Sequence, residues 1–66
     1  MKTGVVKFYN VAQGYGFITE DVTKQDYFWH VSAQLDPEDL LNTGTRVSFT
    51  EGQNRKGTCA LNVSRY

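Results

Sequence analysis

Flat, ring-bearing side chains gather in two short runs of the sequence, QGYGFI and YFWHV. In an extended strand, alternate side chains share one face. Tyr15 and Phe17 therefore point the same way, with only hydrogen on Gly16 between them, and Phe28 and His30 share a face in the second run. If the two strands pair, four flat rings lie on one surface. Unpaired nucleic-acid bases stack on such surfaces.

The alternative is that these rings pack in a hydrophobic core. Val6, Ile18 and Val47 already supply an inner face, and burying both faces would need a second layer that 66 residues cannot provide. Alternation therefore favours an exposed ring surface, on which His30 can also hydrogen-bond a base edge.

Charged side chains next to the rings are further candidates for contact with nucleic acid. Lys7 lies on the first expected strand, beside the ring surface, where it can approach a phosphate. Asp26 abuts the second ring-bearing run. Its carboxylate could accept a hydrogen bond from a base amino group, or it could simply cap the turn.

The sequence shows no catalytic chemistry. No nucleophile or acid pair accompanies His30, no His/Cys cluster has zinc-site spacing, and no P-loop is present. We therefore expect no enzyme activity, no metal, no cofactor and no small-molecule substrate. The single cysteine, Cys59, excludes an intrachain disulfide, and we expect it to be a small strand residue in a reducing compartment.

Length and charge narrow the class of protein. The 66 residues are enough for one small domain, residues 1–66, and the net charge of zero argues against a protein that coats duplexes. A single-strand binder that relies on stacking remains open. No apolar run approaches the roughly 20 residues of a membrane span, and the N-terminal residues lack a signal-peptide core. We therefore expect a soluble cytoplasmic protein without membrane contact.

The chain reads as five strands separated by turns, with glycine for the turns at Gly14 and Gly44. Residues 51–57 read as a polar loop. Asp36, followed by proline and two acidic residues, predicts at most a turn or two of helix before Leu41. The expected strands are Thr3–Asn10, Tyr15–Glu20, Asp26–Val31, Arg46–Thr50 and Thr58–Ser64.

Five short strands with one long connection predict a small closed barrel. Trp29 is large for such a barrel: it could fill the core, sit at one end of it, or be turned towards ligand by a strand bulge. The expected inward-facing residues are Val6, Ile18, Trp29, Val47, Phe49, Leu61 and Val63.

Five segments match one family in order and spacing. GVVKFYN, QGYGFI, YFWHVSA, GTRVSF and ALNV correspond to GxVKWFN, KGFGFI, VFVHFSA, GxxVSF and AxNV of the cold-shock domain. The chain therefore resembles this small oligonucleotide-binding barrel of bacterial cold-shock proteins and Y-box proteins, nearly from end to end.

The resemblance implies an all-β, five-stranded antiparallel OB-fold barrel that binds single-stranded RNA or DNA with little sequence preference. It also implies an RNA-chaperone role that melts weak RNA structure in the cold and so affects transcription or translation. Phosphates would lie near Lys7 and Lys56. Bases would stack on Phe8, Tyr15, Phe17, Phe28 and His30.

Several positions depart from the family pattern. Gln13 replaces a lysine, Val31 replaces a ring, and Phe8 replaces a tryptophan. Trp29 and Tyr27 replace small inward valines. The long loop that follows lacks the aromatic residue often found there. These departures predict a weaker or retuned binder of the same class of ligand.

A second class of function stays open, a protein-interaction module that binds peptides on its aromatic surface or extends an edge strand. Salt dependence discriminates the two functions. For a protein bound to single-stranded nucleic acid, the plot of log K against the logarithm of salt concentration has a slope of roughly −0.7 per phosphate contacted. We expect a monomer, with exchange of a strand between two chains as the alternative.

Overall fold

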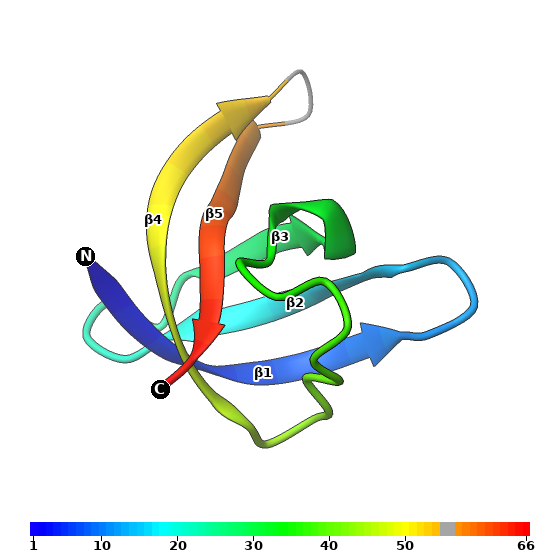
Figure 1. Ribbon diagram of the computed structural model, residues 1–66. Helices are drawn as coiled ribbons and strands as arrows, with labels where there is room; N and C mark the ends of the chain where they lie inside the picture. The colour runs from blue at the N-terminus through cyan, green and yellow to red at the C-terminus, as the bar shows by residue number, and fades with distance from the viewer. Residues whose placement is uncertain (55–56) are drawn as a thin grey trace.

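Five strands curl into a closed barrel in the computed structural model, which describes residues 1–54 and 57–66 (Figure 1). The strands are β1 (Lys2–Asn10), β2 (Tyr15–Glu20), β3 (Asp26–His30), β4 (Arg46–Asn54) and β5 (Gly57–Arg65). Around the barrel the order is β1-β2-β3-β5-β4, with β4 pairing back onto β1. A short 3-10 helix, η1 (Val31–Ala33), follows β3.

The predicted all-β barrel is confirmed, and the prediction of antiparallel pairing holds for every pair except one. β3 and β5 run parallel, with Phe28 opposite Cys59. A closed ring with an odd number of strands cannot alternate direction throughout, so one pair must be parallel. Closure leaves the sheet without a free edge, which is the advantage of a barrel at this size.

The polar loop predicted at residues 51–57 is wrong for residues 51–54 and 57, and residues 55 and 56 lie outside the described residues. Residues 51–54 instead belong to β4, and the ladder with β5 continues through Gln53 opposite Thr58 and Asn54 opposite Gly57. Figure 1 shows this β4–β5 ribbon, yellow and orange, extending beyond the rest of the barrel. A two-stranded ribbon exposes much of its surface, so its strands carry the polar residues that are typical of loops.

Between Asp36 and Leu41 the structure has one hydrogen-bonded turn and no regular helix, which is within the limit of a turn or two predicted from the sequence. Asp36 caps a single turn, in which its Oδ1 accepts from Glu38 N at 3.1 Å and its carbonyl accepts from Asp39 N at 3.0 Å. The side-chain amide of Gln34 donates to the carbonyls of Asp36 and Asp39, both at 2.9 Å. The Asp36 carbonyl therefore accepts from a backbone amide and from the Gln34 side chain, and the Asp39 carbonyl accepts from the Gln34 side chain.

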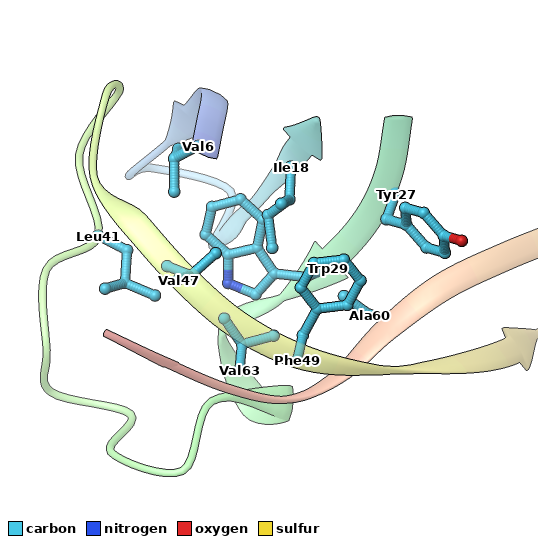
Figure 2. Close-up of a cluster of buried hydrophobic side chains, with 9 residues drawn as sticks. All are labelled: Val6, Ile18, Tyr27, Trp29, Leu41, Val47, Phe49, Ala60 and Val63. Carbon is cyan, nitrogen blue, oxygen red and sulfur yellow. The ribbon is translucent and has the colours of Figure 1, made fainter. Parts of the chain in front are cut away.

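The indole of Trp29 fills the barrel. It is fully buried, and Figure 2 shows it in the middle of the core side chains. Tyr9 stacks on it from β1, with ring centroids 5.4 Å apart. This settles the question that the sequence left open, because Trp29 faces the core. The buried cluster comprises Val6, Ile18, Tyr27, Trp29, Leu41, Val47, Phe49, Ala60 and Val63.

Two neighbours accommodate this large ring. A Cβ on Gly16 would lie 2.5 Å from Trp29 Cζ3 and would also meet the carbonyl of Phe8, so β2 must carry glycine at this point. The indole Nε1 donates to Gln34 Oε1 at 3.0 Å. A buried indole N–H without a partner would be costly, and Gln34 meets that need from the start of the long connection.

Leu61 was predicted to face inward, and this is wrong. Opposite Ser48 and Thr50, the partners on β5 jump from Ser64 to Leu61, so β5 carries one extra residue. Asn62 takes up the bulge with a positive φ of 52°, a conformation that asparagine tolerates better than most residues. The bulge breaks the alternation between positions 61 and 63, so Val63 stays in the core while Leu61 is 42% exposed.

Other sequence predictions are confirmed. Gly14 and Gly44 both have positive φ at turns, and Cys59 is a buried residue of β5. In the described chain, no helix is long and apolar enough to cross a membrane.

The carboxylate of Glu20 organises the turn between β2 and β3. It accepts from the Thr23 hydroxyl at 2.6 Å, from Thr23 N at 2.8 Å and from Val22 N at 3.1 Å. These hydrogen bonds lower the pKa of Glu20 from 4.5 to about 2, and the bond from the Thr23 hydroxyl has the largest effect. The folded state thus favours the charged carboxylate more than the unfolded state does.

We predict that this carboxylate makes stability depend on pH. A lowered pKa in the folded state stabilises the fold above the unfolded value of 4.5, and this contribution is lost as the pH falls from 4.5 to about 2. In urea titrations, the stability difference between wild type and Glu20→Gln should therefore shrink over this range. The difference for Glu38→Gln, at an exposed site, should stay small throughout. A Glu20→Gln difference that does not change with pH would contradict the assignment.

We predict that Trp29→Ala destabilises the barrel by about 3–5 kcal/mol. Trp29→Phe should cost about 1–3 kcal/mol, because Gln34 Oε1 would lose its donor in a buried site. Chemical denaturation followed by circular dichroism measures both. Leu35→Ala, at an exposed leucine, is the control and should change stability by less than about 0.5 kcal/mol. If Trp29→Ala were as mild as this control, Trp29 would not be the centre of the core.

Candidate nucleic-acid interface

The predicted ring residues lie on one face of the barrel, across β1, β2 and β3. In the β2–β3 ladder, Tyr15 lies opposite His30 and Phe17 opposite Phe28, so the two strands pair and gather the four rings on one surface. Phe8 on β1 lies opposite Phe17. We call these five residues, Phe8, Tyr15, Phe17, Phe28 and His30, the ring surface.

The rings hold one another in place and still present open faces. Tyr15 stacks on Phe28 at 5.7 Å, and Phe17 meets Phe28 edge to face at 5.9 Å. Phe8 meets Tyr15 edge to face at 6.2 Å. Phe8 is 44% exposed and Phe17 is 36% exposed. Tyr15, Phe17, Phe28 and His30 line an open depression of about 420 Å³. Mutual packing of this kind orients the rings before any ligand arrives.

A bulge in β1 brings Phe8 onto this face. Val6 pairs with Ile18 and Phe8 pairs with Phe17, so Lys7 is an extra residue between the two pairs. Strict alternation would place Phe8 on the inner face with Val6. The bulge instead exposes both Lys7 and Phe8 while Val6 stays buried. The resemblance to a family placed Phe8 correctly, and alternation alone would not have done so.

His30 is oriented by Ser32, two residues further along the chain. Its Nδ1 accepts from Ser32 N at 3.1 Å and lies 3.0 Å from the Ser32 hydroxyl. A neutral imidazole whose Nδ1 accepts carries its proton on Nε2. The exposed edge of His30 therefore offers a donor, and its ring face remains available for stacking.

Lys7 and Asp26 bind each other. Lys7 Nζ lies 2.8 Å from Asp26 Oδ2, and Thr19 Oγ1 donates to Asp26 Oδ1 at 3.0 Å. The hydrogen bond from Lys7, and after it the one from Thr19, lowers the pKa of Asp26 below its usual value. The sequence placed both side chains at the interface separately. The structure shows that the positive charge of Lys7 is already matched within the protein.

The remaining predicted positions are dispersed. Lys56 lies outside the described residues. Gln13 is exposed in the turn after β1, where its backbone N–H donates to Asn10 Oδ1 at 3.0 Å. Val31, in η1, is half-buried against the turn at Gly14, whose Cβ would lie 3.3 Å from Val31 Cγ1.

Two further depressions adjoin the ring surface and involve residues that sequence reasoning missed. One, of about 270 Å³, lies between Phe17, Asp26 and Phe28 on the barrel and Asn54 and Thr58 on the β4–β5 ribbon. The other lies between Phe28 and the same ribbon near Leu61. Residues 51–57 were read as a loop, so the contribution of β4 to these depressions was not anticipated. The signal available in the sequence was Asn62 itself, because asparagine tolerates the positive φ of a bulge better than most residues.

In the part of the chain that the structure describes, no group of three or more His, Cys, Asp or Glu side chains could hold a metal ion. The arrangement consists of exposed rings, the amide side chains of Gln53 and Asn54 on β4, and one matched ion pair. Such a surface suits flat molecules that offer hydrogen-bonding groups at their edges.

Comparison with known families decides the class of protein. Residues 2–66 match the model of the "'Cold-shock' DNA-binding domain". The chain belongs to the cold-shock domain family. This is a family of proteins that bind single-stranded nucleic acids, and the exposed rings of this cold-shock domain fit that activity.

Known relatives are similar in sequence to this protein along almost the whole chain. "Cold shock protein 2" of Lactiplantibacillus plantarum is 46% identical over 65 residues and covers 96% of both chains. "Cold shock-like protein CspA" of Stigmatella aurantiaca is 44% identical over 64 residues, which are 96% of this chain and 94% of the relative. "Cold shock-like protein CspG" of Escherichia coli K12 is 40% identical over 62 residues, which are 92% of this chain and 89% of the relative.

A solved structure shares the fold. "Drosophila Unr CSD456" superposes with a TM-score of 0.81 at 20% identity. The match covers 98% of this chain and 26% of that one. The likeness at this identity concerns the barrel alone.

We predict that Asp26→Asn releases Lys7 for phosphate. Affinity for a single-stranded oligonucleotide should rise, and the salt dependence of log K should steepen by about 0.7. Thr19→Val removes the other hydrogen bond to Asp26 but leaves the ion pair, so its salt slope should stay unchanged. An unchanged slope for Asp26→Asn would place Lys7 away from phosphate. Weaker binding would mean that Asp26 itself contacts a base.

Proposed function

We propose that residues 1–66 act as one cold-shock domain that binds unpaired stretches of RNA and DNA by stacking bases on the ring surface. Contacts to ring faces carry little sequence information, so the preference among bases is weak. The proposed cellular role is that of an RNA chaperone in the cytoplasm, which affects transcription or translation by keeping RNA unpaired.

The observation that supports this proposal is the open, preorganised ring surface itself. Each base stacked on an aromatic ring contributes on the order of 1–3 kcal/mol. The chain has no net charge, and Lys7 is matched by Asp26. Stacking should therefore contribute more to affinity than phosphate contacts do, and the salt dependence should be shallow.

The proposed mechanism needs no energy source. In a duplex the faces of the bases are covered by their neighbours, so the ring surface can contact them only after the strand opens. A protein that binds the open form and not the paired form shifts the equilibrium towards the open form by mass action. We propose that the protein works in this way as a monomer, without catalysis and without a cofactor.

Fluorescence anisotropy tests the proposal directly. A labelled T-rich oligonucleotide of about seven nucleotides lies within the site size of one such barrel. We expect saturable binding to the single strand, a modest loss of affinity as salt rises, and no binding to the matching duplex. Equal affinity for the duplex, or no binding to the single strand at low salt, would overturn the proposal.

We predict that Phe17→Ala and Phe28→Ala each weaken this binding by about 1–3 kcal/mol while the barrel remains folded. Tyr66→Ala is the matched control. Its ring is 71% exposed and lies near Arg46, away from the ring surface. The control should bind like wild type. Circular dichroism checks the fold of each variant, and a folded Phe17→Ala variant with unchanged affinity would refute stacking on that ring.

A further inference from the structure

Leu61 lies beside the ring surface on the β4–β5 ribbon, where the sequence pattern did not place it. It is 42% exposed and lines a depression of about 220 Å³ that also includes Phe28, His30, Ala33 and Gln53. We call this the ribbon depression. Phe28 lines it together with both other depressions, so the three form one continuous surface.

The strand geometry fixes the side chain of Leu61 across the ribbon. A Cβ on Gly52 would lie 2.5 Å from Leu61 Cδ1 and 2.8 Å from Cγ. Leu61 therefore lies flat over the bare backbone of β4 at Gly52. Thr50 Oγ1 donates to the carbonyl of Leu61 at 3.2 Å, and Asn62 Nδ2 donates to Thr50 Oγ1 at 3.1 Å. The bulge that exposes Leu61 is thus held by side-chain hydrogen bonds.

A single exposed leucine needs no explanation on a protein surface. Leu35 and Leu40 are exposed too, and neither lines any of the three depressions. Leu61 differs in its surroundings, because Phe28 and His30 border it on one side and the amide of Gln53 on the other. An apolar floor with a donor and an acceptor at its rim suits a nucleobase, which has an apolar face and a polar edge.

We infer that Leu61 forms the floor of a further base subsite, which extends the ring surface from β3 onto the β4–β5 ribbon. The occupant is an unpaired base of the same strand that stacks on the rings. This inference rests on the proposed function and adds a residue and a place to it. The subsite lies on the opposite side of Phe28 from Phe8, so it lengthens the bound segment at one end.

The test combines a variant with a lesion in the ligand. In a T-rich oligonucleotide of about seven nucleotides, one base at a time is removed to leave an abasic position, and affinity is measured by anisotropy for wild type and Leu61→Ala. We expect Leu61→Ala to weaken binding of the intact oligonucleotide about fivefold, the low end for a stacked base. Removing one particular base should lower the affinity of wild type by a similar factor and leave the affinity of Leu61→Ala unchanged.

This coupling identifies the base that contacts Leu61, because two changes that remove the same contact are not additive. The abasic position coupled to Leu61 should differ from the position coupled to Phe17→Ala. Val22→Ala is the control. Val22 is highly exposed in the turn between β2 and β3 and lines none of the depressions, so this variant should match wild type at every position.

Other outcomes are decisive. If Leu61→Ala binds every oligonucleotide like wild type, the subsite does not exist, and the ribbon depression is free for a different occupant such as a peptide side chain. If it weakens all the oligonucleotides equally, Leu61 acts through Phe28 or His30, and the inference is overturned. If wild type itself fails to bind the intact single strand, the proposed function fails first, and the subsite fails with it.

Discussion

The packing of Trp29 inside the barrel is the constraint on which the other features depend. Its indole occupies the centre of the core, Tyr9 stacks on it, and its N–H needs a partner, which Gln34 provides. Gln34 in turn holds the long connection through two backbone carbonyls. One large side chain therefore couples the core to the segment least constrained by strand pairing, which matters in a domain small enough to be only marginally stable.

The same packing supports the outer surface. Because the indole presses against β2 at Gly16, the two ring-bearing residues on either side of that glycine are fixed by the backbone that covers the core. The ring surface is built on the outside of the strands whose inside contains Trp29. The ring surface alone keeps five aromatic or imidazole side chains out of the core in a chain of 66 residues, so the core must be filled efficiently by the residues that remain.

Charge plays a secondary part in this architecture. The ion pairs join neighbouring strands or connect strand ends to loops, as in Arg46 with Asp21 and Arg65 with Asp39. Lys7 and Asp26 form a different kind of pair at the border of the ring surface, from β1 to β3 across β2. A binding face whose adjacent cation is already matched favours ligands with accessible flat faces over ligands that offer mainly phosphates, which is the distinction between single strands and duplexes.

The alternation of side chains along a strand is a local property, so the residues alone predicted an all-β barrel and, on the condition that β2 and β3 pair, the gathering of rings on one face. The remaining features depend on contacts between strands. Two bulges, at Lys7 and Asn62, shift alternation by one residue and so expose Phe8 and Leu61. A bulge depends on which residues lie opposite, so it cannot be read from one strand alone. The partners of Trp29 and Lys7 were likewise set in three dimensions, because Tyr9 reaches Trp29 from β1 and Asp26 reaches Lys7 from β3, and the pattern of a single strand does not specify either contact.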